Sequence, residues 1–309
     1  MKISIIGAGN VGSALAERVL THNLADVVLL DIVEDLAKAK AFDLSDASPL
    51  MGYEKRVLGT SDYKETCDSK VVIVTAGFPR RPGMSRDDLI HKNGEIMGAV
   101  LKNIKTSSPD AIFIVVTNPL DIMTYLAYKE IGGDRRKILG MAGNLDTARF
   151  KALLSQELGV SSEKIETFVL GSHGDTMVPL VSKTLINKKP LGSVLSRERI
   201  EKLVEKTKKR GGEIVALLKS GSAYFSPSAA CFEILKAIIN DTKKTIPCSL
   251  VLKGEYGIED SAIGVPAKIG KDGAEEILEW ELPENELNAL RNSAKAAKEM
   301  FDKCKKQID

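Results

Sequence analysis

The chain has 309 residues, and its 44 basic and 42 acidic side chains give a formal net charge of +2. Hydrophobic residues make up 43% of the sequence and charged residues 28%, which is typical of a globular protein long enough for two domains. The balanced charge argues against a nucleic-acid partner, and apolar runs such as 71–76 and 111–117 are too short to cross a bilayer. We therefore expect neither nucleic acid nor a membrane among its partners.

A glycine-rich turn follows the first apolar run at residues 2–6. Its spacing, Gly7-x-Gly9-x-x-Gly12, is typical of a dinucleotide site. Gly7 allows a tight turn, Gly9 lets a pyrophosphate approach the backbone, and Gly12 lets the following helix pack closely on the strand. The turn therefore predicts a bound dinucleotide, and an ordinary strand–helix–strand unit with a tight turn is the alternative.

A second apolar run ends in Asp31, 19 residues after Gly12. A carboxylate there can accept hydrogen bonds from the adenosine ribose and would repel a 2′-phosphate, so NAD is favoured over NADP. The helix between the two runs begins near Asn10 and Val11, where its free backbone N–H groups can bind the phosphates. No Lys-Ser/Thr pair follows the glycines, which excludes a P-loop.

Short β-branched runs alternate with helical patterns through residues 1–143. This pattern predicts an α/β domain, a doubly wound parallel sheet of the Rossmann type with right-handed crossovers. The predicted strands are 2–6, 26–30, 55–59, 70–75, 111–116 and 137–140, and the predicted helices are 11–21, 36–47, 87–107 and 119–130. The cofactor would lie at the carboxyl ends of these strands.

The pattern changes after about residue 143, and residues 144–309 are predicted to form an α+β substrate or catalytic domain. The predicted helices are 145–157, 196–219, 226–240 and 283–306, and the predicted strands lie near 166–170, 178–184, 245–252 and 261–269. Asn187-Lys188 and Gly254-Glu255 suggest antiparallel hairpins. No low-complexity linker separates the halves, so we expect them to pack tightly with the active site between them.

Four cysteines lie far apart and form no CxxC or Cys/His spacing: Cys67, Cys231, Cys248 and Cys304. We expect free thiols in a reducing cytosol and no metal site. No signal peptide precedes the first predicted strand, which begins at Lys2. A cytoplasmic location follows as the expectation.

Of the three histidines, His173 has the context of a functional residue. His22 ends a predicted helix and His91 lies inside one, so both are expected to be surface or capping residues. His173 follows a predicted strand within Gly171-Ser172-His173-Gly174-Asp175, where flanking glycines suit a side chain presented in a cleft for proton transfer. The alternative is a loop histidine that bonds a backbone carbonyl.

A histidine that acts as a base works better with a carboxylate that orients it, and Asp146 and Asp175 are the candidates. Asp146 begins a predicted helix, and Arg149 lies three residues further on the same face. Asp-x-x-Arg on a helix is usually a surface ion pair, so the residues by themselves leave both interpretations open.

The segment 77–86 follows the fourth predicted strand and carries Arg80, Arg81 and Arg86 among two prolines and two glycines. A cationic loop at the carboxyl end of such a strand is well placed to bind a carboxylate and to close as a lid. Asn118 ends the fifth predicted strand, where its amide could reach cofactor or substrate or cap the next helix.

Five ordered motifs together resemble the malate and lactate dehydrogenase superfamily along essentially the whole chain, closest to its lactate-dehydrogenase-like malate dehydrogenases. They are GAGNVG with Asp31, TAGFPRRPGMSRDDL, VTNPLD, GNLDTARF and GSHGD. The resemblance implies that Gly7, Gly9, Asn10, Val11, Gly12, Asp31, Asn93, Thr117 and Asn118 bind NAD. It also implies homodimers or homotetramers. The apolar residues Phe42, Leu44 and Leu50 could serve such an interface, and packing in the core would explain them equally well.

The resemblance also assigns the chemistry. His173 would accept the proton in alcohol oxidation, with Asp146 as its carboxylate partner. Arg149 would hold the C1 carboxylate of the substrate in two hydrogen bonds. Arg86 would polarise the reacting carbonyl, and Asn118 would donate a hydrogen bond to the same oxygen.

Arg80 favours malate as the substrate, because similar lactate dehydrogenases carry a neutral glutamine at this position. A second arginine needs a partner, which the C4 carboxylate of malate or oxaloacetate supplies. By the same resemblance, Ala223 stands where lactate dehydrogenases usually carry a threonine that faces the substrate, so it would leave room for that charged end. Asn144 replaces a commonly apolar residue and calls the local packing into question.

Lactate dehydrogenase is the alternative within the superfamily. Outside it, an NAD-dependent glycosidase would need a metal held by Cys and His, and a catalytically silent nucleotide-binding protein would not need His173, Asp146 and Arg149. We therefore expect reversible oxidation of (S)-malate by NAD.

Overall fold

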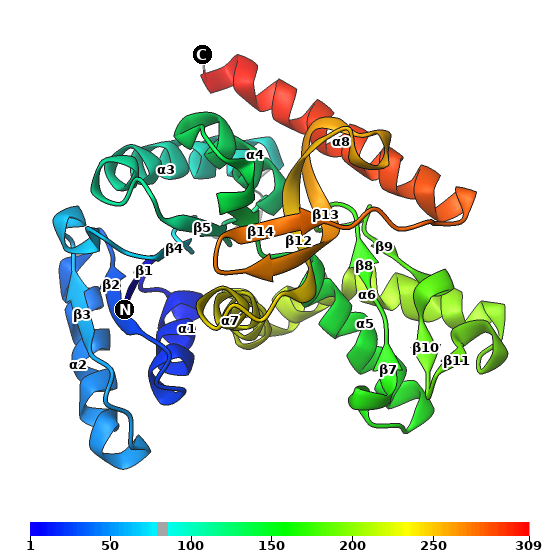
Figure 1. Cartoon of the computed structure of the whole chain (residues 1–309), viewed down its shortest axis with the longest axis horizontal. Coiled ribbons are helices and arrows are strands. Elements are labelled where there is room, and N and C mark those ends of the chain that lie inside the picture. The colour runs from blue at the N-terminus through cyan, green and yellow to red at the C-terminus, as the bar shows by residue number, and fades with distance from the viewer. Residues whose placement is uncertain (79–85, 309) are drawn as a thin grey trace.

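A computed structural model describes residues 1–78 and 86–308, with side chains for 1–78 and 88–303. Figure 1 shows a central twisted sheet with helices on both sides and α8 (Glu284–Ile308) running along one edge of the molecule. None of the helices in these residues is long and apolar enough to cross a membrane.

Six strands of the first half run parallel in the order β3-β2-β1-β4-β5-β6. They are β1 (Lys2–Ile6), β2 (Asp26–Leu30), β3 (Val57–Thr60), β4 (Val71–Val74), β5 (Ile112–Val115) and β6 (Ile138–Gly140). Strand order reverses between β1 and β4, as in a doubly wound sheet. The predicted Rossmann arrangement is confirmed, with each strand within two residues of its predicted bounds.

Successive residues of each strand point to opposite sides of the sheet, and nearly all of them are apolar. Both faces of the sheet are therefore apolar. Residues such as Ile5 and Ile73 pack with α1 (Asn10–Thr21) and α7 (Phe225–Ile239). Residues such as Val74 and Phe113 pack instead with α3 (Arg86–Ser107) and α4 (Leu120–Ile131). Figure 1 shows these two helix pairs on opposite sides of the strands. Along the edge, α2 (Glu34–Met51) packs beside β3.

The second half contains both helices and short strands. Its remaining elements are α5 (Gly143–Leu158), β7 (Ile165–Glu166), β8 (Val169–Leu170), β9 (Val178–Pro179), β10 (Leu185–Ile186), β11 (Lys189–Pro190), α6 (Arg197–Leu218), β12 (Lys244–Lys253), β13 (Glu259–Gly270) and β14 (Gly273–Ile277). Both predicted hairpins are confirmed, since β10 pairs with β11 and β12 with β13. Asn187 and Lys188 both have positive φ, as a two-residue hairpin turn of type I′ requires.

Three details of the second half differ from the predictions. The predicted strand 178–184 ends at Pro179 and continues as a short 3-10 helix, Val181–Lys183. The predicted strand 166–170 is two strands in separate sheets, β7 and β8. β14 was not predicted, because its sequence, GAEEI, is poor in β-branched residues.

The second half also extends the first half's sheet. β12 pairs antiparallel with β6 at Ser249 and Gly140, so β12, β13 and β14 complete a nine-stranded sheet. The shared sheet anchors the two halves to each other and so holds together a site that takes residues from both.

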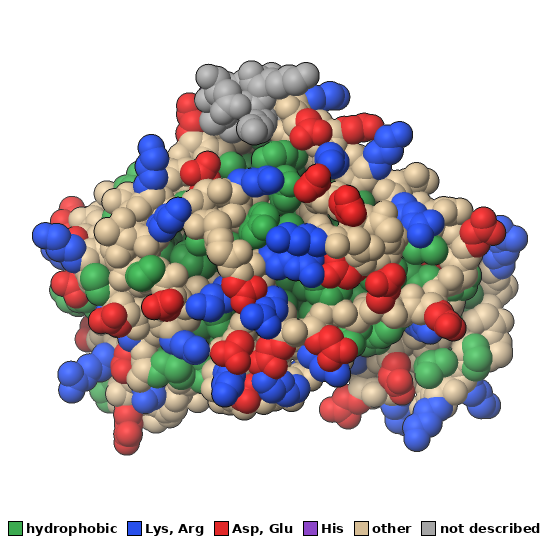
Figure 2. Space-filling view, turned by 45° about the horizontal axis from the view of Figure 1, so that its top comes forward, with side chains coloured by type: hydrophobic (Ala, Val, Ile, Leu, Met, Phe, Trp, Pro, Cys, Tyr) green, Lys and Arg blue, Asp and Glu red, His purple; other side chains and the backbone are tan. Residues whose placement is uncertain are grey.

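The surface of the molecule carries both kinds of charge. Acidic and basic side chains are interspersed over the face seen in Figure 2.

Candidate active site

The glycine turn after β1 has room for a ligand at one glycine and no room for a side chain at the other two. Gly7 has φ +109°, and a Cβ on Gly12 would lie 1.9 Å from the Gly7 carbonyl oxygen. A Cβ on Gly9 would meet nothing within 4 Å, and no side chain caps the first turn of α1. The free N–H groups of α1 therefore adjoin open space, which fits the pyrophosphate of a dinucleotide.

Asp31 lies at the end of β2, beside this turn. Its Oδ2 accepts a hydrogen bond from the Ala8 N–H at 2.8 Å, and its Oδ1 accepts one from the Val33 N–H at 3.0 Å. These bonds hold the carboxylate next to the glycines while each oxygen keeps further accepting capacity. The arrangement fits the ribose contact expected of Asp31. Asn10 is exposed and Val11 half-buried at the start of α1.

Asn93 and Thr117 connect the loops that follow β4 and β5. The Asn93 Nδ2 donates to the Asn118 carbonyl oxygen at 2.6 Å, and its Oδ1 accepts from the Phe78 N–H at 2.6 Å. The Thr117 hydroxyl donates to the Ala76 carbonyl oxygen at 2.6 Å. Both side chains are buried, whereas Asn118 is exposed at a cis peptide bond to Pro119. Direct bonds from Asn93 and Thr117 to NAD stay a prediction.

In the second half, α5 and the 171–175 segment bring together the residues expected to act on the substrate. Asp146 lies in the first turn of α5, and Arg149 follows one turn later. The His173 Nδ1 lies 2.7 Å from the Asp146 Oδ2, and the Arg149 Nη1 lies 3.4 Å from the Asp146 Oδ1. Asp146 is therefore the carboxylate that holds His173, while Asp175 is exposed.

The three side chains are shielded from solvent to different degrees. The exposed fractions are 17% for His173, 10% for Arg149 and 2% for Asp146. Because a carboxylate only accepts hydrogen bonds, the Nδ1–H of His173 is the donor and Nε2 is left to meet a substrate. The dyad is thus oriented for proton exchange at Nε2.

Burial and neighbouring charges together set the pKa values of His173 and Arg149. Burial alone would lower the pKa of His173, but the charge and hydrogen bond of Asp146 outweigh it, and the pKa lies above the ordinary value of 6.5. Burial lowers the pKa of Arg149, although a guanidinium stays protonated throughout the physiological range. The Nε of Arg149 is buried without a hydrogen-bond partner. A buried, incompletely bonded cation is the mark of an anion-binding position.

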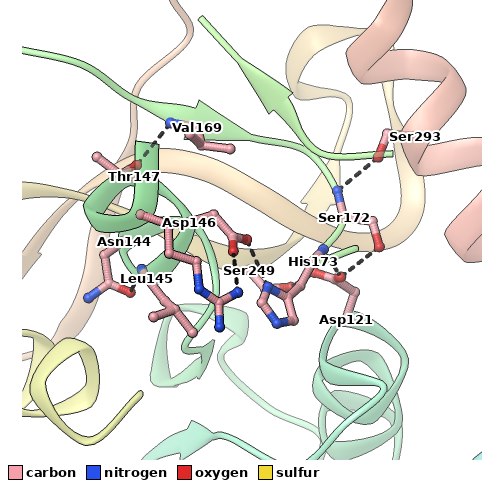
Figure 3. A network of polar contacts seen from close by, with 11 residues as sticks. Asp121, Asn144, Leu145, Asp146, Thr147, Val169, Ser172, His173, Ser249 and Ser293 are labelled. Atoms are coloured by element: carbon pink, nitrogen blue, oxygen red, sulfur yellow. Dashed lines mark hydrogen bonds and ion pairs between the residues drawn. The ribbon is translucent and has the colours of Figure 1, made fainter. Parts of the chain in front are cut away.

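Asp121, the last residue of the VTNPLD motif and one for which no role was predicted, also belongs to this network. Figure 3 shows its carboxylate between Ser172, the backbone of His173 and Ser249. The signal in the sequence was an acidic residue in an otherwise apolar stretch at the start of a helix, directly after Asn118-Pro119-Leu120.

Asn144 is well satisfied despite its departure from the family's pattern. Its Nδ2 donates to the Ala230 carbonyl oxygen on α7 at 2.7 Å, and its Oδ1 accepts from the Leu145 N–H. Asn144 therefore packs without an unsatisfied polar group on its side chain.

The other two histidines lie away from this site. The His22 Nδ1 bonds the Arg18 carbonyl oxygen at the end of α1, and the His91 Nδ1 lies 3.5 Å from the Glu95 Oε1.

Two expected substrate contacts cannot be placed. Arg80, with Arg81, lies outside the described residues, and Arg86 begins α3 with its side chain outside them. Among the side chains that the structure does describe, no group of three His, Cys, Asp or Glu residues could hold a metal ion.

A nucleotide cradle at the end of a parallel sheet, combined with an imidazole poised for proton exchange, defines an NAD-dependent dehydrogenase. Comparison with known proteins leads to the family. The family described as lactate/malate dehydrogenase, NAD binding domain, matches residues 1–140, and its alpha/beta C-terminal domain matches residues 143–308. The chain belongs to the lactate/malate dehydrogenase family, and its cofactor is NAD.

Individual relatives agree with this assignment. The chain is 47% identical to a malate dehydrogenase of Chloroherpeton thalassium over 98% of each protein. The malate dehydrogenase structure from Salinibacter ruber superposes with a TM-score of 0.95 at 43% identity and covers 100% of this chain and 99% of that one. A lactate dehydrogenase from Cryptosporidium parvum was solved with lactic acid and its nicotinamide cofactor. It superposes with a TM-score of 0.94 at 37% identity and covers 97% of this chain and 98% of that one.

Proposed function

We propose that this chain catalyses the reaction (S)-malate + NAD⁺ ⇌ oxaloacetate + NADH + H⁺. The observation that carries the proposal is the buried Arg149, whose unpartnered Nε lies on the side chain that also contacts the Asp146 carboxylate of the His173 dyad. A small carboxylic acid bound there would place its neighbouring hydroxyl group near His173. The relatives named malate dehydrogenase support the choice of malate.

The residues divide the work. Arg149 binds the C1 carboxylate through its planar guanidinium. In malate oxidation the His173 Nε2 accepts the hydroxyl proton, and Asp146 stabilises the imidazolium that results. When bound, NAD supplies the acceptor for the hydride that leaves C2. The residues that would hold NAD are the turn of Gly7, Gly9 and Gly12 together with Asp31. Arg86 and Asn118 complete the proposal as donors to the reacting oxygen.

Arg80 is proposed to select malate over lactate. With oxaloacetate bound, the cation pairs with the C4 carboxylate; with pyruvate it faces a methyl group. Losing one partner of a buried charge pair costs about 2–5 kcal/mol, which corresponds to between about 30-fold and several thousand-fold in kcat/KM.

The test compares kcat/KM for oxaloacetate and pyruvate, each with NADH and with NADPH. We expect oxaloacetate and NADH to be preferred, and Arg80→Gln to erode the preference for oxaloacetate by raising its KM. An exposed arginine on α6, changed in Arg197→Gln, is the matched control and should leave the ratio unaltered. A preference of the unmodified enzyme for pyruvate would refute the proposed role of Arg80 and favour lactate dehydrogenase.

We propose further that the chain forms a homodimer or homotetramer. Within α2 the residues Phe42 and Leu50 are 67% and 87% exposed, and Met51 beside Leu50 is exposed as well. Large apolar side chains gathered on one surface helix favour an interface between chains. Leu44, the third candidate, packs partly buried against the core and so needs no interface.

The division between the NAD-binding and catalytic domains is placed after residue 143, at the start of α5.

The last part of the proposal is the location of the protein. A cytoplasmic location is supported by the thiols of Cys231 and Cys248, which are buried and unpaired, as expected in a reducing compartment. Cell fractionation with an antibody against the chain tests the location.

A further inference from the structure

Asp121 is a buried carboxylate at the junction of three segments far apart in the sequence. It lies in the first turn of α4 and is only 3% exposed. Its Oδ2 accepts hydrogen bonds from the Ser172 hydroxyl and the His173 N–H, both at 2.7 Å, and its Oδ1 accepts one from the Ser249 hydroxyl at 2.6 Å (Figure 3). One side chain of the first half thus holds the backbone of His173.

The donors around Asp121 match its ionised form. All three of its hydrogen bonds are donated to it, so a carboxylate satisfies them better than a carboxyl group. Burial raises the pKa of Asp121 above its ordinary value, and the bonds from Ser249, Ser172 and the His173 N–H oppose this shift without reversing it. Among the described residues, His173 is the cationic partner that lowers this pKa, so a charged Asp121 is best stabilised when the imidazole is protonated.

The same coupling acts on His173. The groups that set its charge are Asp146 and Arg149 on α5 and Asp121 on α4. Asp146 contacts the ring directly, whereas Asp121 contacts the backbone and acts on the ring through space. His173 is therefore held by two carboxylates: Asp146 at the Nδ1 of its ring and Asp121 at its backbone N–H.

We propose that Asp121 is a positioning residue for proton transfer: it fixes the main chain of His173 and adds a second negative charge that favours the imidazolium. It does so from α4, which begins two residues after Asn118. This inference rests on the proposed role of His173.

The test is Asp121→Asn, which preserves the volume and removes the charge. Reduction of oxaloacetate requires protonated His173, so its rate falls as the pH rises through the pKa of His173. Loss of the Asp121 charge lowers that pKa, and we expect the midpoint of kcat to move to lower pH by on the order of half a unit, because the carboxylate does not touch the ring. Misplacement of the imidazole should lower kcat roughly 10-fold to 100-fold while KM stays unchanged.

Glu286→Gln is the matched control. Glu286 is another buried carboxylate that accepts a backbone N–H and a hydroxyl, both from Ser182, but it does not act on His173. We expect both variants to lower Tm and only Asp121→Asn to move the pH midpoint. If the two variants change Tm alike and leave the pH profile unaltered, Asp121 has a structural role alone and the inference is overturned.

A second variant covers the case in which Asp121→Asn fails to fold. Ser172→Ala combined with Ser249→Ala leaves the carboxyl group in place and removes two of its donors, which favours its protonated form. The midpoint should move in the same direction by a smaller amount, and an unchanged midpoint overturns the inference. Absence of turnover in the unmodified enzyme would instead refute the proposed function.

Discussion

Two opposing effects act on the imidazole of His173. Burial favours the neutral ring, whereas the Asp146 carboxylate at 2.7 Å favours the imidazolium, and the pKa ends above 6.5 because the carboxylate prevails. In the proposed reaction the same residue is protonated for reduction and neutral for oxidation. The two directions of the reaction are therefore expected to have opposite pH dependences centred on one pKa.

This leads to a prediction about Asp146. In the unmodified enzyme, oxaloacetate reduction should fall and malate oxidation should rise as the pH increases through a midpoint above 6.5. Asp146→Asn removes the largest favourable influence on the imidazolium, so both midpoints should move to lower pH. Loss of the orienting carboxylate should also lower kcat by roughly 10²-fold or more. Initial rates across a pH series measure both effects, and unaltered midpoints would contradict the role given to Asp146.

At the scale of the element, the turn between β1 and α1 shows how three glycines serve different needs. Gly7 and Gly12 are required by the fold, since a Cβ on Gly12 would lie 1.9 Å from the Gly7 carbonyl oxygen. Gly9 has ordinary φ and open space around it. The packing of the chain therefore does not require a glycine at this position, and we expect the bound cofactor to require it.

Two alanine variants separate these needs. Gly9→Ala should keep the Tm of the unmodified enzyme and weaken NADH binding, because its Cβ points into the space left for the pyrophosphate. Gly12→Ala should destabilise the fold by about 1–3 kcal/mol, because the helix must shift away from the strand. Thermal unfolding and NADH fluorescence titration measure the two effects. Equal loss of Tm in both variants would contradict the assignment of Gly9 to the ligand.

At the scale of the whole molecule, the two halves share a sheet. The pairing of Ser249 on β12 with Gly140 on β6 joins them, and the Ser249 hydroxyl also bonds Asp121. The junction of the sheet is thus continuous with the polar network that holds His173. We expect the halves to unfold together, because separating them would break both the ladder and the buried hydrogen bonds.

The exposed apolar residues of α2 give a prediction for the assembly. Light scattering should give a multiple of the single-chain mass, and Phe42→Ser with Leu50→Ser should shift it toward that of one chain. Val194→Ser changes an exposed apolar residue outside α2 and serves as the control. A monomeric unmodified protein would contradict the proposal.

Much of the fold and site could be predicted from the sequence because the signals are local. The β-branched runs, the spacing of Gly7, Gly9 and Gly12, and the acid that ends β2 each depend on neighbours within one supersecondary unit. The order of the motifs was sufficient to predict the family and the dyad of His173 with Asp146. The choice of Asp146 over Asp175 also came from that resemblance, and in the structure the Asp146 Oδ2 lies 2.7 Å from the His173 Nδ1.

The rest depended on contacts between distant segments. Asp121 bonds Ser249 across 128 positions of the chain, and a single residue pair joins β12 to β6. No local pattern encodes such contacts, because they arise only when helices and strands pack and buried polar groups must find partners. The sequence by itself determined the family and the cofactor, and it predicted the reacting residues. Only the tertiary structure decided how the two halves join and which buried carboxylate accepts the backbone N–H of His173.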